Sequence, residues 1–237
     1  MSTDKRSPKR TSASARPARG PAPTRGRDER SRKLSELRRT ATDVYRRAIL
    51  DAAERVFSTG KLAATRMAAI AKEAGLASGT LYNYFDSKEE IFQSLIEARG
   101  QELLGELEEV AARGLQPLPR LSATVAACLG HLEQHREMFL LFLQSPMLEL
   151  AVSGSLSKAA ERVNRRCMKV FEDAVGWAAQ TGVLRRDIPP AELAIFLGGI
   201  IHGVVRAWLV DGQGRGAIGV KATTIVDLFV SGAGAPR

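Results

Sequence analysis

The chain has 237 residues, 44% of them hydrophobic, which is enough for one large domain or for a small domain plus a medium one. Its longest apolar stretch is interrupted by His202 and Arg206, so no run reaches the ~18 residues that span a membrane, and the N-terminus lacks an apolar signal segment. From these features we expect a cytoplasmic protein rather than a secreted or membrane-spanning one. Cys128 and Cys167 are then expected to be core thiols rather than a disulfide.

Residues 1–40 are predicted to form a disordered basic tail. They contain 13 Lys or Arg and 4 Asp or Glu, whereas the remaining residues contain 22 of each sign, so the net charge of +9 lies in this segment. Almost no apolar residue precedes Leu34, and such a segment cannot bury enough surface to offset its ordering entropy. The tail is either a solvated terminus or a flexible arm that contacts DNA phosphates and the minor groove.

A first helix is predicted over residues 41–59, followed by a helix-turn-helix over residues 66–74 and 78–85. Thr65 is placed to cap the first helix of this pair, and Gly75 is expected to adopt a left-handed conformation in the turn. An ordinary helical hairpin has the same turn spacing. The second helix, however, is rich in hydroxyl, amide and phenol groups, which suit DNA phosphates and base edges better than a core.

A further helix is predicted over residues 88–112, capped by Asp86 or Ser87 with acidic residues at capping-box spacing. Lys88 lies in its first turn, where a positive charge opposes the helix dipole and a nearby phosphate relieves the conflict. The helix is amphipathic and joins the helix-turn-helix to the rest of the chain. A ligand that tilts it is therefore expected to move the DNA-reading elements.

Residues 45–99 resemble the N-terminal domain of tetracycline-repressor-type (TetR-family) transcriptional regulators. The resemblance rests on ILDAAERVF, Thr65, IAKEAGL, GTLYNYF and SKEEIF, in that order and spacing. It implies an all-α protein, with an N-terminal three-helix DNA-binding domain (residues 41–92) and a C-terminal helical bundle for ligand binding and dimerisation (residues 93–232). Ala77 stands where this family usually has Ser, which affects the operator sequence rather than the fold. The candidate DNA-binding residues are Thr65, Ser78, Gly79, Thr80, Tyr82, Asn83, Tyr84 and Lys88.

The bundle is predicted to continue as amphipathic helices after a break at Pro117 and Pro119. One helix is expected from about Arg120 through Phe139, and a long one over residues 155–181. A mostly apolar effector is expected in a cavity among the helices of residues 100–181. The candidate pocket residues are Cys128, His131, His135, Phe139, Phe142, Cys167 and Phe171.

Three of these residues also have the spacing of metal ligands. Cys128, His131 and His135 stand at i, i+3 and i+7, so that one side of a helix can present all three to zinc. Cys128 and His135 nevertheless fall on the apolar stripe, which favours a pocket-lining or core role. We therefore expect no metal and no cofactor.

Residues 190–211 are apolar on nearly every side, so a partner subunit is expected to cover part of this helix, together with a last helix over residues 217–231. His202 and Arg206 within it either anchor an acidic or polar effector or pair across a dimer with an acid such as Asp211. A homodimer also suits a palindromic site, whose two major-groove segments lie roughly 34–36 Å apart. The candidate dimer-interface residues are Phe196, Gly199, Ile200, Gly203, Val204, Ile225 and Phe229.

The sequence contains no G-x-S-x-G, Walker or H-E-x-x-H motif, so we do not expect an enzyme. The predicted function is that of a ligand-responsive transcriptional regulator. It would be a homodimer that binds a palindromic double-stranded operator, without a membrane, and is released by a small, mostly apolar effector. Repression rather than activation follows from the resemblance alone. The alternatives are a sequence-nonspecific nucleic-acid binder acting through the basic tail, and an enzyme or metal-binding protein of the helical body.

Overall fold

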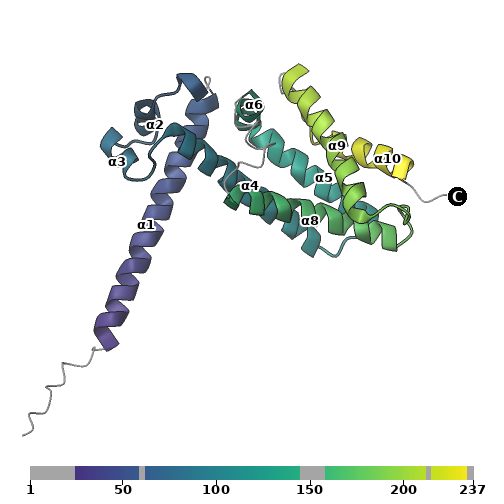
Figure 1. The fold of residues 1–237 in the computed structure, drawn as a ribbon, viewed down its shortest axis with the longest axis horizontal. Helices are drawn as coiled ribbons and strands as arrows, with labels where there is room; N and C mark the ends of the chain where they lie inside the picture. Colours follow the sequence, from purple (N-terminus) through teal and green to yellow (C-terminus); the bar gives the residue numbers. More distant parts are fainter. Residues whose placement is uncertain (1–24, 59–61, 145–157, 212–214, 234–237) are drawn as a thin grey trace, which may run out of the picture. The chain divides into compact units, whose positions relative to one another are not determined.

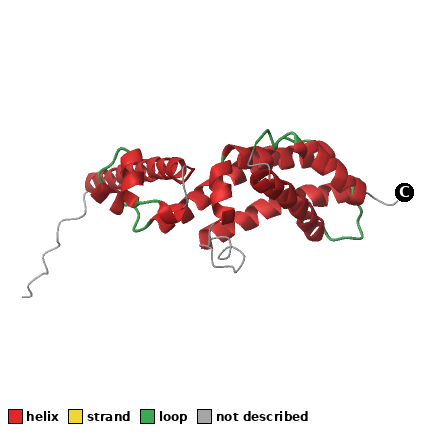
Figure 2. Ribbon diagram, turned by 90° about the horizontal axis from the view of Figure 1, so that it is seen from above, coloured by secondary structure: helices red, strands yellow, loops and turns green. Residues whose placement is uncertain are grey.

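The computed structural model describes residues 25–58, 62–144, 158–211 and 215–233, and within these ranges the chain is helical and contains no strand (Figure 2). The described residues up to Val44 and those from Tyr45 onward form two compact units, and each is treated by itself. Figure 1 shows the helices, which in chain order are α1 (Arg25–Ser58), α2 (Met67–Glu73), α3 (Ser78–Tyr82), α4 (Lys88–Ala112), α5 (Pro117–Gln134), α6 (Arg136–Gln144), α8 (Lys158–Gln180), α9 (Pro190–Arg206) and α10 (Lys221–Ala233). A 3₁₀ turn, η1 (Leu62–Ala64), precedes α2, and a π-helical turn, η2 (Ala207–Asp211), follows α9.

Helix α1 begins at Arg25, well before the predicted start at residue 41, so the disorder predicted for residues 25–40 is wrong. This stretch is rich in Arg, Glu, Lys and Leu, which are good helix formers, and it has no proline. Extending an existing helix costs little compared with nucleating a new one. Apolar burial, which is low in this stretch, is therefore not the only contribution that decides whether it is helical. The rest of the predicted tail, residues 1–24, lies outside the described part of the chain.

The helices predicted to bind DNA share one core, which is formed by the C-terminal half of α1, by α2 and α3, and by the start of α4. Gly75 has the predicted left-handed conformation in the turn, with φ of +68°. The N-cap of α2 is Arg66 rather than Thr65, and Arg66 makes no side-chain cap hydrogen bond. Helix α6 also contributes two side chains to this core, so it is in direct contact with the DNA-binding helices. The buried members are Ile49, Leu50, Ala53, Phe57, Ile70, Ala71, Leu81, Phe85, Ile91, Phe92, Leu95, Met138 and Leu141.

Helix α4 begins with the predicted kind of cap, and Ser87 rather than Asp86 provides it. The Ser87 hydroxyl accepts a hydrogen bond from the Glu90 backbone N–H at 3.1 Å. The Glu90 carboxylate in turn accepts one from the Asp86 N–H at 2.7 Å. These reciprocal bonds satisfy two backbone donors at the helix start and fix the position of Lys88, the first residue of the helix.

The bundle packs α4, α5, α8, α9 and α10 around a second core (Figure 1). The predicted break at Pro117 is instead the first position of α5, a place that suits proline because its missing N–H is not needed there. The helix predicted through Phe139 is two helices, since α5 ends at Gln134 and α6 starts at Arg136. Glu133 joins α5 to the start of α10, because its carboxylate accepts from the backbone N–H groups of Ile218 and Gly219 at 3.1 and 3.2 Å.

Helix α9 carries the most apolar segment among the described residues. The window Pro190–Val210 is long and apolar enough to cross a membrane by length and composition alone, although the sequence predicted no such segment. The window is 33% buried within the bundle, and core helices of soluble proteins meet the same test. Its remaining apolar surface therefore has no cover among the described residues of a single chain.

Candidate DNA-binding surface and effector cavities

Helix α3 has a buried side and an exposed side. Leu81 is 0% exposed, and Phe85, just past the helix, is 1% exposed, so both anchor this segment in the core. Ser78, Gly79 and Asn83 are exposed, and the Tyr82 side chain is 53% exposed. The polar groups that can contact DNA therefore lie on one face of a firmly seated helix, while Thr80 is half-buried at its edge.

The segment that follows α3 is fastened to α1. The Arg46 guanidinium donates a hydrogen bond to the Tyr84 carbonyl at 2.7 Å and stacks 4.1 Å from the centre of the Phe85 ring. The Tyr84 ring lies 5.7 Å from that of Tyr45, and Tyr84 is half-buried. Arg46 is thus engaged within the fold, and Tyr84 presents only part of its side chain to solvent.

Two candidates that are far apart in sequence, Thr65 and Lys88, are brought together. The Lys88 ammonium donates a hydrogen bond to the Thr65 backbone carbonyl at 3.0 Å, and both residues are half-buried. Arg66 beside them is exposed. Sequence reasoning did not single out Arg66. Like Lys88, however, Arg66 places a positive charge at the N-terminus of a helix, the end that attracts anions.

A cluster of ionic side chains, the Arg99 cluster, links α4 to α1, and sequence reasoning missed it. Arg99 is 8% exposed, and its guanidinium donates to Asp51 at 2.8 Å and to Glu54 at 2.5 Å on α1, and to Glu102 at 2.9 Å on α4. His135, between α5 and α6, approaches the other Glu54 oxygen at 2.8 Å through Nδ1. Arg99 thereby ties α4 to α1, and Glu54 extends the cluster to His135.

The Arg99 cluster makes stability depend on pH. Burial alone would raise the pKa of the Glu54 carboxyl, but hydrogen bonds and positive charge from His135 and Arg99 together hold it below its usual value. Because the folded-state pKa is the lower one, this stabilisation is complete above about pH 4.5 and is lost as the pH falls through the folded-state value. We expect Glu54→Gln to lose less stability than the wild type between about pH 6.5 and pH 3.5, as measured by urea unfolding at each pH. Equal losses in the two proteins would contradict this assignment.

Cys128, His131 and His135 do not form a metal site in the structure. His131 Nδ1 lies 3.0 Å from Glu106, and His135 is held by Glu54. Burial raises the pKa of the Cys128 thiol to about 12, so the sulfur is protonated at neutral pH. Across the described residues, no group of three or more His, Cys, Asp or Glu side chains is arranged to hold a metal ion.

The predicted pocket residues are distributed over three cavities. The α9 cavity, of about 300 Å³, contains Cys128, Phe139 and Phe171 in its wall. The α4 cavity, of about 340 Å³, is lined by His131, Phe139 and Cys167. His135 instead borders a polar opening beside the Arg99 cluster. The ring of Phe139 therefore touches both apolar cavities, and the Phe142 side chain lies outside the described part.

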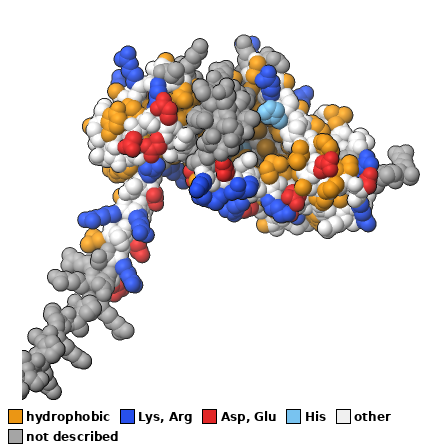
Figure 3. Space-filling view, in the orientation of Figure 1, with side chains coloured by type: hydrophobic (Ala, Val, Ile, Leu, Met, Phe, Trp, Pro, Cys, Tyr) orange, Lys and Arg blue, Asp and Glu red, His pale blue; other side chains and the backbone are white. Residues whose placement is uncertain are grey.

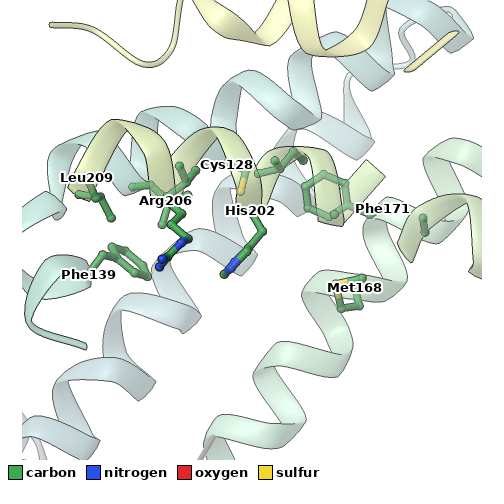
Figure 4. A pocket seen from close by; sticks show the side chains of 12 residues that line it. Cys128, Phe139, Met168, Phe171, His202, Arg206 and Leu209 are labelled. Atoms are coloured by element: carbon green, nitrogen blue, oxygen red, sulfur yellow. The ribbon is translucent and has the colours of Figure 1, made fainter. Parts of the chain in front are cut away.

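The α9 cavity is apolar apart from a short polar edge. Figure 4 shows the side chains of His202 and Arg206 projecting from α9 into the space between Phe139 and Met168. The sequence had left their role open between an effector anchor and a dimer contact, and the structure places both in the cavity wall. The full lining is Cys128, Leu132, Phe139, Met168, Phe171, Ala194, Gly198, Ile201, His202, Val205, Arg206 and Leu209.

The candidate dimer residues divide between the surface and the interior. Phe196 is 51% exposed, Gly199 and Gly203 are exposed, and Ile200 and Val204 are half-buried. The prediction for α10 is wrong in register, since Ile225 and Phe229 are buried in their own bundle and Leu228 is exposed instead. Apolar side chains are visible over the α8 and α9 part of the surface in Figure 3. The exposed apolar side chains of α9 and α10 are Ile195, Phe196 and Leu228.

Comparison with known proteins agrees with this geometry. Residues 49–95 match the family described as bacterial regulatory proteins of the tetR family. The HTH-type transcriptional repressor KstR2 of Mycobacterium tuberculosis is 28% identical over 140 residues, which cover 59% of this chain and 69% of that protein. The fatty acid metabolism regulator protein of Bacillus subtilis is 24% identical over 187 residues, covering 78% of this chain and 93% of the relative.

A solved structure shows the same fold over most of the chain. The transcriptional regulator FadR from Bacillus subtilis, in complex with stearoyl-CoA, superposes with a TM-score of 0.67 at 22% identity and covers 78% of this chain and 97% of that one. The match thus extends beyond the DNA-binding helices into the bundle. The matched segment therefore identifies a DNA-binding domain of the tetR family in this chain, and the rest of the described chain shares the fold of the solved transcriptional regulator.

Proposed function

We propose that the protein is a ligand-responsive repressor that binds a palindromic operator as a homodimer. The observation that carries the proposal is α3, whose exposed face offers Ser78, Gly79, Tyr82 and Asn83 while Leu81 seats the helix in the core. A helix held in this way can enter a major groove without losing its orientation. The relatives named as repressors favour repression over activation.

In this proposal the residues of α3 enter the groove, and the residues beside α3 contact the DNA backbone. Tyr82, Thr80 and Asn83 reach base edges or phosphates, and the small Ser78 and Gly79 let the helix start sit close to DNA. Lys88 and Thr65, joined by their hydrogen bond, hold a phosphate beside α3, and the half-buried Tyr84 packs at the edge of this surface. The helix-turn-helix domain is assigned to residues 41–92, and the effector-binding and dimerisation domain to residues 93–232.

The exposed apolar face of α9, with Leu228 of α10, is the proposed dimer interface. Phe196→Ser removes a large apolar contact on each side of such an interface, so we expect the dimer dissociation constant to rise about tenfold. Sedimentation equilibrium over a concentration series measures this change. The matched control is Leu118→Ser on α5, which removes another exposed apolar side chain, 39% exposed, from outside α9 and α10. An unchanged constant for Phe196→Ser would move the interface elsewhere.

The proposed effector is a mostly apolar molecule that occupies the cavities of the bundle. The apolar walls support this proposal, as do relatives described as regulators of fatty acid metabolism and ketosteroids, one of them solved with stearoyl-CoA. Phe139 of α6 lines both cavities, while Met138 and Leu141 of the same helix lie in the core of the DNA-binding helices. A ligand that moves α6 or α4 therefore shifts the populations of DNA-competent and released states, typically by about 1–3 kcal/mol.

The proposal involves no catalysis, cofactor or metal, and it places the protein in the cytoplasm. Its relatives are transcriptional regulators rather than enzymes. The competing function is nonspecific binding to nucleic acid through the basic N-terminal residues, which predicts binding that follows salt concentration and ignores sequence.

Selection of bound duplexes from a random DNA pool at moderate salt tests the proposed function. We expect the full chain, and also residues 25–237, to enrich one inverted repeat. The two half-sites should be about one helical turn, or a multiple of it, apart. If only the full chain binds, and no sequence is enriched, the nonspecific binder is favoured and the repressor proposal fails.

A further inference from the structure

His202 and Arg206 form a polar edge on an otherwise apolar cavity. They are four residues apart on α9, so their side chains lie on the same side of the helix, and both are exposed. Figure 4 shows them extending side by side toward the space bounded by Phe139 and Met168. The π-helical turn η2 follows Arg206 directly and carries Leu209, another lining residue.

The positive charge of Arg206 has no counterpart within the cavity. No Asp or Glu is among the described residues that line it, and none of the described residues forms a hydrogen bond or ion pair with the side chain of Arg206 or of His202. This differs from the Arg99 cluster, where three carboxylates surround the guanidinium. A guanidinium is permanently charged and offers paired N–H donors that match the oxygens of a carboxylate or phosphate.

We propose that the α9 cavity binds an amphiphile, with its apolar tail among the side chains of α5, α6 and α8 and its anionic head held by Arg206. His202 supplies a second donor to the head group from the preceding turn of α9. This inference rests on the proposed function, because it specifies the chemistry of the proposed effector. Of the possible anionic head groups we propose a carboxylate. A phosphate head has the same oxygen chemistry, so the experiment includes both.

The competing explanation is that Arg206 pairs with an acidic residue of a second copy of this chain. The exposed side of α9 that carries Arg206 also carries Phe196 and Gly199, so such a pair is sterically open. The two explanations predict different effects of the same substitution. In our proposal Arg206→Gln weakens the binding of anions, whereas in the competing one it weakens the dimer.

The test is calorimetric titration of the full chain, without DNA, with decanoate, decyl phosphate and 1-decanol, which share one tail and differ in the head. We expect decanoate to bind about tenfold more tightly than decanol, since a charge-assisted hydrogen bond is added to the same apolar contact. Arg206→Gln should lower the affinity for decanoate by about the same factor and change the affinity for decanol by no more than about twofold. The matched control is Arg162→Gln, at an exposed arginine of α8 outside the cavity lining, which should change neither. If decyl phosphate binds more tightly than decanoate, the head group is a phosphate rather than the carboxylate proposed here.

Three results would overturn the proposal: equal affinity for decanoate and decanol, decanoate binding that Arg206→Gln leaves unchanged, or no binding of any of the three molecules. Sedimentation of the same variant separates loss of the dimer from loss of ligand. Operator binding is measured separately on the selected inverted repeat. If decanol and decanoate bind equally and both release DNA, the head-group inference fails while the repressor proposal stands.

Discussion

Tyr82→Ala is expected to lower operator affinity about 100-fold, because each dimer loses a base or phosphate contact from both of its α3 helices. Tyr82 is 53% exposed and has no part in the core, so the substitution should leave the urea midpoint almost unchanged. Fluorescence anisotropy with a labelled copy of the selected inverted repeat measures the affinity. A fall in affinity without a fall in stability assigns Tyr82 to DNA recognition.

Two companion variants refine this result. Tyr82→Phe keeps the ring and removes the hydroxyl, so it shows whether hydrogen bonding or ring contact carries the effect. Lys88→Ala should also weaken binding strongly and reduce the salt dependence, because a lysine that holds a phosphate releases counterions on binding. Since Lys88 also donates to the Thr65 carbonyl, its stability has to be measured in parallel. Wild-type affinity in both Tyr82→Ala and Lys88→Ala would refute the proposed DNA-binding surface.

Arg99→Leu is expected to destabilise the protein by about 3 kcal/mol, because it leaves three carboxylates close together without their shared cation. The Arg99 side chain is 9% exposed and that of Glu54 is 18% exposed, so solvent compensates only in part. Asp51, at 44%, is more open and is expected to contribute less. Urea unfolding near neutral pH measures the change, and the loss should shrink in acid as the carboxylates are protonated.

The control for Arg99→Leu is Arg47→Gln. Arg47 contacts the same Glu102 at 3.1 Å, but its side chain is 72% exposed, and exposed ion pairs contribute roughly 0–1 kcal/mol. If both substitutions lower the free energy of unfolding by the same amount, the contribution of Arg99 to stability does not depend on its burial. Arg99→Lys keeps the charge but not the planar arrangement of donors, so an intermediate loss would show that hydrogen-bond geometry matters as well.

The sequence was most informative where local chemistry decides the structure. The left-handed Gly75 was predicted, and Ser87 was one of the two residues predicted to cap α4; both features depend on a few neighbouring residues. Pro117 was misjudged because proline breaks a helix from inside but begins one well, and the sequence alone did not say where the helix starts.

The cavities and the Arg99 cluster depend on contacts between distant segments, which helical periodicity does not specify. Arg99 lies on the buried stripe of α4, and only the fold shows that Asp51 and Glu54 face it. The error at Ile225 has a related cause. Both sides of α10 carry apolar residues, so the pattern could not say which side faces its own bundle and which carries Leu228.

The shared position of Phe139 implies a threshold in ligand length. A molecule that fits within about 300 Å³ contacts Phe139 from the α9 cavity alone, whereas a longer one that also occupies the α4 cavity contacts it from both. Because Met138, the preceding residue of α6, lies in the core that α1 to α4 share, a ligand that shifts Phe139 is expected to disturb that core. The response to ligand length would then change in a step at the length at which the ligand also occupies the second cavity.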